Sequence, residues 1–99
     1  SIGPCIVYKK YIENPENLNI SSRVNGETRQ NSNTKNLIFS APYLIEELSK
    51  GMTIIPGDII ATGTPAGVGM GFKPPKYLKS GDVVECEIEK IGILKNIVE

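Results

Sequence analysis

Residues 57–71 read GDIIATGTPAGVGMG, a short apolar run that leads directly into a loop of small residues. Ile59 to Ala61 is flanked by glycines, which predicts a short buried strand. Thr62 to Gly71 contains four glycines, two threonines and one proline. Glycine lets backbone amides approach a ligand closely, and threonine adds hydroxyl groups. We therefore expect the functional site at this loop.

Two interpretations of the loop remain open from its spacing. The glycines at 67, 69 and 71 suggest phosphate binding, but no Gly-Lys-Ser/Thr follows and Pro74-Pro75 takes the place of a helix, which disfavours a nucleotide site. What remains is residues 61–67, a strand end that presents the hydroxyls of Thr62 and Thr64. A ligand site and a turn with sterically required glycines explain this stretch equally well.

On either side of the loop lie a helical and a non-helical segment. Residues 40–51, SAPYLIEELSKG, begin with a Ser N-cap and an early proline and end in glycine, which predicts the one helix. Leu44, Ile45 and Leu48 fall on one helical face, which we expect to cover a sheet. Residues 72–78, FKPPKYL, cannot form a helix or an inner strand and are expected to lie as a flap over the glycine loop.

The remaining chain reads as strands and turns. Asn25-Gly26 between residues 20–24 and 27–30 predicts a hairpin with a type I′ turn. Residues 2–8, IGPCIVY, predict a further strand, and residues 9–19 a surface loop. The polar run 31–36 could bind a ligand or only turn the chain, and the turn is the favoured interpretation.

The carboxy-terminal third predicts a pair of strands. In residues 83–89 the apolar Val84, Cys86 and Ile88 alternate with Glu85, Glu87 and Glu89, which is typical of a half-buried strand. Residues 93–98 are expected to pair with it. The three glutamates could hold a metal only if side chains about 7 Å apart converged. A solvated face balanced by lysines is the favoured interpretation.

These elements predict a mostly-β (α+β) fold, a mixed β-roll or sandwich with one short helix. The 99 residues are expected to form a single domain, near the lower size limit for burying a core without help. The first residue is Ser1, followed almost at once by a strand-like run, which suggests that an upstream portion has been removed.

Composition narrows the function classes. Eleven Lys and Arg balance eleven Asp and Glu, which disfavours nucleic acid and anionic membranes as partners. With no long apolar run or signal segment, we expect a soluble, cytoplasmic protein. Histidine is absent, which excludes a self-contained Ser-His or Cys-His nucleophile and disfavours zinc. Cys5 and Cys86 are expected to be buried, reduced thiols.

Several motifs together resemble the fumarylacetoacetate hydrolase family. The main match is PGDIIATGTPAGVG at residues 56–69, followed by Pro74-Pro75 and by LKSGDVVE at 78–85. The remaining matches are GP at 3–4, VNG at 24–26 with Gln30, and IGILKN at 91–96. The resemblance spans almost the whole chain and implies the fold of this family, with residues 1–99 as the carboxy-terminal part of a larger catalytic domain.

The resemblance also implies a function. Family members, among them 2-hydroxyhepta-2,4-diene-1,7-dioate isomerases and acylpyruvases, hydrolyse, decarboxylate or isomerise small oxo-acids or dioic acids, as in aromatic catabolism. They use Mg²⁺, Mn²⁺ or Ca²⁺. The metal ligands of the family, a Glu-x-Glu pair and an Asp, precede the Gly-Pro strand, so they are expected upstream of this chain. Glu85 and Glu87 follow the threonine loop and cannot inherit that role.

By the same resemblance, Gly63 and Thr64 bind a carboxylate or oxo group of the substrate. No catalytic or metal-binding residue is expected within the 99 residues, so the segment alone is expected to be inactive. The family also implies a homodimer. The alternative is a non-catalytic domain that binds a small anion or serves as a scaffold.

Overall fold

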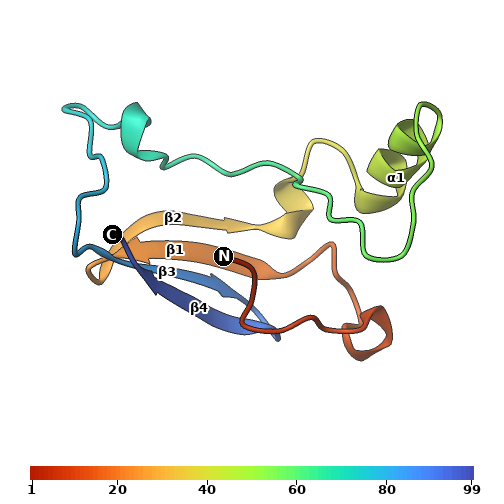
Figure 1. Cartoon of the computed structure of the whole chain (residues 1–99), viewed down its shortest axis with the longest axis horizontal. Helices are drawn as coiled ribbons and strands as arrows, with labels where there is room; N and C mark the ends of the chain where they lie inside the picture. The colour runs from red at the N-terminus through yellow and green to blue at the C-terminus, as the bar shows by residue number, and fades with distance from the viewer.

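A computed structural model describes residues 1–99 and shows one four-stranded antiparallel sheet in the order β2-β1-β3-β4 (Figure 1). The strands are β1 (Asn19–Val24), β2 (Glu27–Asn33), β3 (Val83–Ile88) and β4 (Gly92–Ile97). The one α-helix is α1 (Ala41–Ser49), and short 3₁₀ turns are η1 (Lys9–Tyr11), η2 (Thr34–Asn36) and η3 (Gly69–Gly71). The mostly-β class with one short helix is confirmed, and the sheet is a single open layer.

Local turn chemistry explains both hairpins. Asn25 and Gly26 take φ values of 50° and 81°, as a type I′ turn requires, and this turn sets the β1–β2 register. Lys90, in the turn between β3 and β4, and Gly92, the first residue of β4, also take positive φ values. The register of β1 and β2 shifts after Ser22, which pairs with Gln30. Both predicted strand pairs are therefore confirmed.

Two predicted strands are absent. Residues 2–8 form no strand, and Ile2 and Ile6 are 74% and 94% exposed. The Ser1 hydroxyl donates a hydrogen bond to the Asn96 side chain of β4 at 3.0 Å, but no backbone hydrogen bond joins residues 1–4 to a strand. Ile59 to Ala61 is an extended connection without ladder hydrogen bonds. An apolar run becomes a strand only when a neighbour supplies N–H and C=O partners.

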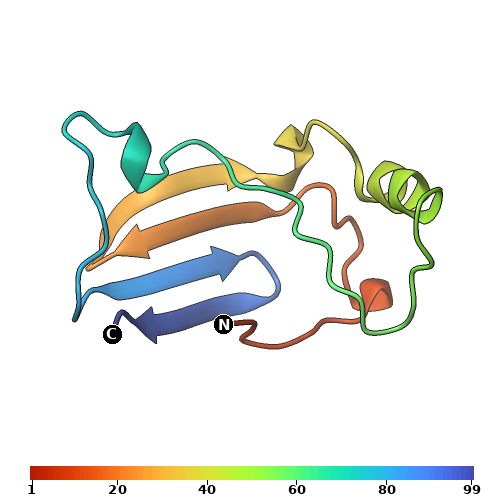
Figure 2. The ribbon, with the colours of Figure 1, turned by 45° about the horizontal axis from the view of Figure 1, so that its top comes forward.

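The helix forms as predicted but does not cover the sheet. The Ser40 hydroxyl accepts a hydrogen bond from the Tyr43 N–H at 3.4 Å, as an N-cap should. On the face expected to be buried, Ile45 is 50% and Leu48 is 38% exposed. Figure 2 shows α1 beyond the end of the sheet. The packing expectation was wrong because periodicity identifies an apolar face but not the surface it meets.

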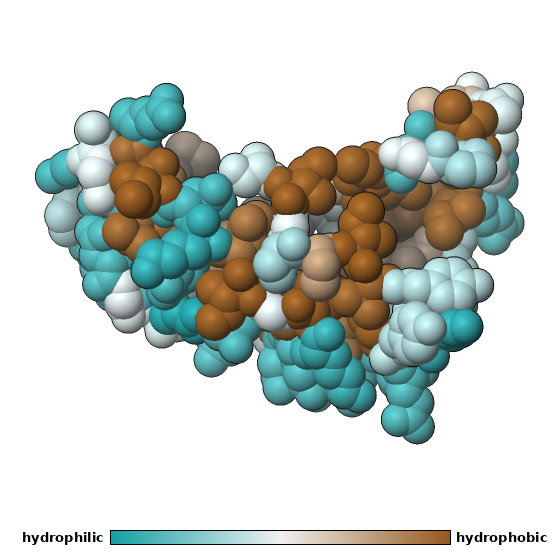
Figure 3. Space-filling model, turned by 60° about the horizontal axis from the view of Figure 1, so that its bottom comes forward, coloured by the Kyte–Doolittle hydropathy of each residue, from teal (hydrophilic) through white to brown (hydrophobic).

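The chain encloses very little core. Only Ile12, Leu18 and Val24 are buried, and the radius of gyration is 15.2 Å against about 13 Å for a compact chain of this length. Hydrophobic atoms spread across the middle of one hollowed face (Figure 3). Cys5 and Cys86 are exposed, which corrects the prediction of buried thiols. None of the helices has the length and apolar character that crossing a bilayer would require.

Candidate functional site

The first part of the glycine loop is fastened to the sheet by Gln30 of β2. The Gln30 Nε2 donates hydrogen bonds to the Thr64 hydroxyl at 2.7 Å and to the Pro65 carbonyl at 2.9 Å. Its Oε1 accepts from the Ser22 hydroxyl of β1 at 2.9 Å. Figure 2 shows the connection between α1 and η3 passing alongside β2. The sheet thereby holds the backbone at Thr64 and Pro65.

Gly63 and Thr64 lie in the open part of the loop. Gly63 takes a φ of 96°, and a Cβ added there would meet nothing within 4 Å. The N–H groups of Gly63, Thr64 and Ala66 donate no hydrogen bond within the chain. This stretch therefore combines free amide donors, one hydroxyl and open space, which is the composition of an anion-binding backbone.

The second part of the loop is packed against its neighbours. A Cβ on Gly67 would lie 2.0 Å from the Arg29 carbonyl oxygen, and one on Gly69 would lie 2.3 Å from the Lys76 carbonyl oxygen. Both contacts are with backbone, which cannot yield as a flexible side chain does. Gly67 and Gly69 are therefore sterically required, as in the interpretation of the loop as a turn. The interpretation as a ligand site is compatible with Gly63, where a Cβ would meet nothing.

The segment 72–78 folds back onto this second part, as expected of the flap. The Lys76 N–H donates to the Gly69 carbonyl at 2.9 Å. The Lys76 ammonium pairs with Glu27 of β2 at 2.5 Å, and this hydrogen bond lowers the pKa of Glu27, with a smaller contribution from Arg29. The flap thus ties the far end of the loop to the sheet and leaves the Gly63 end uncovered.

A hollow of about 510 Å³ lies beside Gly63 and Thr64. Residues 62–66 line one side, residues 32–34 and 36–39 another, and Ile20 and Leu44 complete the wall. The wall combines hydroxyls and amides with apolar side chains, and none of its side chains is titratable. Such a hollow can bind and orient a small polar molecule but cannot itself accept or release a proton.

The polar run 31–36 has mainly local partners. The Asn33 side chain accepts from the Lys35 N–H at 2.9 Å, and the Asn36 amide donates to the Ser32 hydroxyl at 3.2 Å. Thr34 joins the preceding loop, since its hydroxyl accepts from the Leu18 N–H and donates to the Pro15 carbonyl. The favoured turn interpretation describes these bonds, although the same run also faces the hollow.

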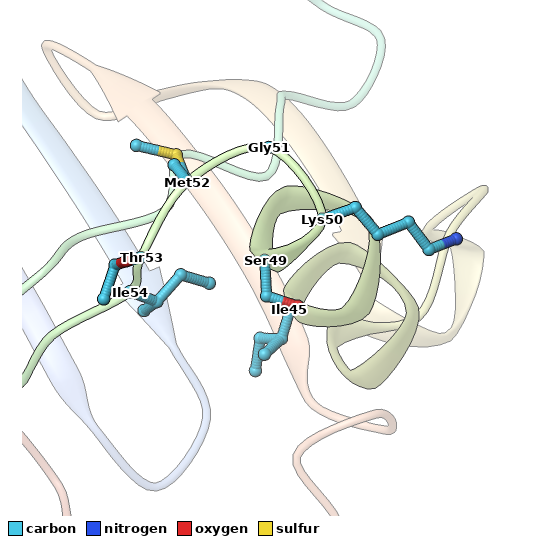
Figure 4. A pocket seen from close by; sticks show the side chains of 7 residues that line it. All are labelled: Ile45, Ser49, Lys50, Gly51, Met52, Thr53 and Ile54. Atoms are coloured by element: carbon cyan, nitrogen blue, oxygen red, sulfur yellow. The ribbon is translucent and has the colours of Figure 1, made fainter.

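A second hollow of about 610 Å³ lies at the end of α1 (Figure 4). Its wall comes from one continuous stretch, Ile45 and residues 49–54. Figure 4 shows the Lys50 side chain pointing away from the other labelled side chains. This hollow is open and brings no distant polar groups together, so the hollow beside Gly63 is the better candidate site.

The glutamates of β3 already have partners. Arg23 of β1 contacts Glu85 at 3.3 Å and Glu87 at 2.8 Å, and Lys95 of β4 lies 3.4 Å from Glu85. The hydrogen bond from Arg23, followed by that from Lys95, lowers the pKa of Glu85. Glu89, which directly follows β3, accepts from the Asn19 N–H at 3.0 Å.

No group of three or more His, Cys, Asp or Glu in the chain has a metal-binding arrangement. The Glu85 and Glu87 carboxylates on β3 are paired with the basic side chains of Arg23 and Lys95. The residues present therefore do not fit a divalent metal site. The interpretation of a charged face balanced by basic side chains agrees with these contacts, with Arg23 and Lys95 as the balancing residues.

Sequence reasoning selected two residues of the hollow, Gly63 and Thr64, and missed the role of Gln30, which does not line the hollow but bonds to Thr64. The structure places Gly63 and Thr64 together on the wall. In the sequence Gln30 is only one residue of the family resemblance, and its contact with Thr64 spans 34 residues. Nothing local predicts that contact, because it depends on how the loop crosses β2.

The chain matches the family described as "Fumarylacetoacetate (FAA) hydrolase C-terminal" over residues 1–99. It is 57% identical over 95 residues to oxaloacetate tautomerase YisK of Bacillus subtilis, covering 96% of this chain and 32% of that protein. It is 53% identical over 97 residues to the mitochondrial oxaloacetate tautomerase Fahd2a of Rattus norvegicus, covering 98% and 31%. The chain therefore spans about a third of the length of these relatives.

Solved structures agree with this match. A fumarylacetoacetate hydrolase from Exiguobacterium antarcticum superposes with a TM-score of 0.94 at 48% identity, covering 98% of this chain and 35% of that one. A maleylpyruvate hydrolase from Sphingobium sp. SYK-6, solved with manganese(II) and pyruvate, gives a TM-score of 0.87 at 38% identity, covering 97% and 34%.

Proposed function

Because the chain belongs to the fumarylacetoacetate hydrolase family, we propose that residues 1–99 form the carboxy-terminal part of a larger catalytic domain that acts on small oxo-acids or dioic acids. Within it, the loop at Gly63 and Thr64 anchors an oxygen-bearing group of the substrate. The observation that supports this role is the set of unused donors at the hollow: the N–H groups of Gly63, Thr64 and Ala66 beside the Thr64 hydroxyl.

The chemistry of the anchor follows from these donors. A carboxylate or oxo oxygen accepts hydrogen bonds from several N–H and O–H groups at once, and bonds to a charged acceptor are about twice as strong as neutral ones. Donors held in place by a folded loop also stabilise negative charge that develops on the substrate. Apolar side chains such as Leu37 and Phe39 line the same hollow and offer contacts to the carbon skeleton of a small acid.

The loop binds and orients, and the reacting groups come from outside it. The hollow has no titratable side chain, so the proton transfer that an isomerisation needs falls to another part of the protein. We propose a divalent cation, Mg²⁺, Mn²⁺ or Ca²⁺, with ligands outside residues 1–99, because Glu85 and Glu87 of β3 are ion-paired and a related hydrolase was solved with manganese.

The reaction class is proposed from the relatives. The two relatives compared above are named as oxaloacetate tautomerases, and a structural neighbour is a hydrolase. Isomerisation of an oxo-acid is therefore the first activity to assay, followed by C–C hydrolysis and decarboxylation. The homodimer and the cytoplasmic location remain predictions, and one of the relatives is named as mitochondrial.

The test is turnover of oxo-acids by the full-length protein that carries this chain. Oxaloacetate, an acylpyruvate and a 2-hydroxy-dienoic diacid are supplied with Mg²⁺ or Mn²⁺, and keto–enol conversion, C–C cleavage and CO₂ release are followed separately. We expect turnover that a chelator abolishes. Binding of oxalate without turnover of any of these compounds would instead support the scaffold alternative.

A further inference from the structure

We propose that Gln30 is a positioning residue that fixes the direction of the Thr64 hydroxyl, so that Thr64 acts as a hydrogen-bond donor toward the ligand. This inference rests on the proposed anchoring role of Thr64 and adds the residue that determines it. It begins with the orientation of the Gln30 side-chain amide, whose two ends have opposite hydrogen-bonding character.

The Pro65 carbonyl determines that orientation. A carbonyl oxygen only accepts, so the Gln30 atom that lies 2.9 Å from it must be the NH₂ group. The opposite end, Oε1, then faces the Ser22 hydroxyl at 2.9 Å, and Ser22 donates to it. Both ends of the amide are matched, so the reversed orientation would place like groups together at Pro65.

The second N–H of the same NH₂ group determines whether the Thr64 hydroxyl donates or accepts toward Gln30. It lies 2.7 Å from the Thr64 hydroxyl oxygen, which therefore accepts. A hydroxyl that accepts from one side keeps its own hydrogen for another direction. No group of the chain accepts a hydrogen bond from Thr64, and the residue faces the hollow. The hydroxyl hydrogen is thus available to a ligand oxygen.

This arrangement selects the chemical class of the ligand. The Thr64 hydroxyl and the unused N–H groups of Gly63 and Thr64 are all hydrogen-bond donors on residues that line the hollow. An oxyanion such as a carboxylate satisfies all of them, whereas an ammonium or a primary amide N–H would face donors. With glutamate at position 30 the hydrogen bond would run the other way, because a carboxylate only accepts. The Thr64 hydroxyl would then donate to that carboxylate and no longer to the ligand.

The test compares Gln30→Glu with Gln30→Met in the full-length protein, with oxalate as the binding probe in calorimetry and kcat/KM for oxaloacetate as the second readout. Methionine has a similar length and no strong hydrogen-bonding group, so Thr64 can still rotate to donate. We expect Gln30→Met to weaken oxalate binding several-fold and Gln30→Glu to weaken it about ten- to a hundred-fold. If Gln30 only held the loop against the sheet, Gln30→Met would weaken oxalate binding more than Gln30→Glu, because glutamate keeps one hydrogen bond to Thr64 and methionine keeps none.

The second part of the test is a double-mutant cycle with Thr64→Val. If Gln30 acts through Thr64, Gln30→Glu should cost little further affinity once the hydroxyl is gone. An equal cost in both backgrounds would overturn the positioning role. Full oxalate affinity and activity in Thr64→Val alone would overturn the proposed anchoring function as well. If Thr64→Val lowered oxalate affinity and activity but Gln30→Glu changed neither, the Gln30 proposal alone would be overturned. Thermal melts of all variants separate these outcomes from unfolding.

Discussion

The two parts of the glycine loop use the same residue type for different purposes. In residues 62–66 the space around Gly63 is open, and the backbone N–H groups have no partner in the chain. In residues 67–71 the glycines admit neighbouring carbonyls, at Arg29 for Gly67 and at Lys76 for Gly69. A glycine-rich loop can therefore be half ligand site and half packing device, and its composition does not reveal which half is which.

The largest effect is expected at Gly67. In Gly67→Ala the new methyl group would lie 2.0 Å from the Arg29 carbonyl oxygen at a φ of 108°. Overpacking costs about 1–3 kcal/mol and a non-glycine residue at positive φ about 1–2 kcal/mol more. We expect the free energy of unfolding to fall by about 2–5 kcal/mol, measured by chemical denaturation of the full-length protein.

Gly57→Ala is the matched control for this variant. Gly57 takes a similar φ of 103°, but a Cβ there meets nothing within 4 Å. It should show only the strain component, about 1–2 kcal/mol. Equal losses for the two variants would mean that the contact with Arg29 is not a constraint and that the two parts of the loop are alike.

Gly63→Ala is expected to separate activity from stability. Its φ of 96° and open surroundings resemble those of Gly57, so the loss of stability should also be about 1–2 kcal/mol. Because Gly63 lines the hollow, the added methyl group should lower kcat/KM for an oxo-acid, while Gly57→Ala should leave it unchanged. Similar kinetics for the two variants would remove the distinction between the open loop and an ordinary turn.

A smaller effect is expected from acid. Hydrogen bonds lower the pKa of Glu27, Asp82 and Glu85, chiefly from Lys76, Asn25 and Arg23 respectively. A lowered carboxyl pKa contributes stability that is present above the unfolded value and is lost as the pH falls through the folded value. Stability should therefore be flat near neutral pH and decline below about pH 4.5, the ordinary value for glutamate.

The decline should be modest, because these carboxyl groups remain in contact with water. Thermal melts between pH 7 and pH 3 measure it, with Glu85→Gln as the variant. That variant should be less stable than the parent at pH 7, and the difference should shrink in acid. A difference that persists unchanged at pH 3 would show that the Arg23 and Lys95 contacts contribute nothing through charge.

The smallest effect is expected for metal binding at β3. Glu85 and Glu87 are paired with Arg23, so Glu87→Gln should leave the affinity of the full-length protein for Mg²⁺ and Mn²⁺ unchanged. Calorimetric titration measures this affinity. A marked loss of affinity would make the sheet carboxylates metal ligands and would place the chemical site away from the glycine loop.

The sequence predicted those parts of the fold that depend on neighbouring residues. Asn25-Gly26 determines its turn through φ values that both residues tolerate, and the alternation in residues 83–89 determines which side chains share a face. Ser40 caps α1 through a bond that spans three residues. For each of these features, all the residues that determine it lie within a short stretch of chain.

The predictions that failed depended on partners elsewhere. The apolar runs at 2–8 and 59–61 look like strands, but no neighbouring strand pairs with them. The apolar face of α1 and the two cysteines were expected to be buried and are exposed. At the site, Gly63 and Thr64 could be selected from sequence, whereas the Gln30 contact and the packing of Gly67 required the loop's path across β2.

The central claim is that the Thr64 hydroxyl donates to the ligand as well as accepting from Gln30, and Thr64→Val tests it most directly. The change removes one charge-assisted hydrogen bond while nearly preserving shape, a loss of about 1.5–3 kcal/mol. Steady-state kinetics of the full-length protein on oxaloacetate should show kcat/KM lowered about ten- to a hundred-fold, with nearly the same melting temperature. Thr62→Val removes another hydroxyl from the wall of the same hollow, one without the Gln30 contact, and a smaller loss in that variant would assign the effect to Thr64. Full activity in Thr64→Val, or a loss that follows unfolding, would contradict the claim.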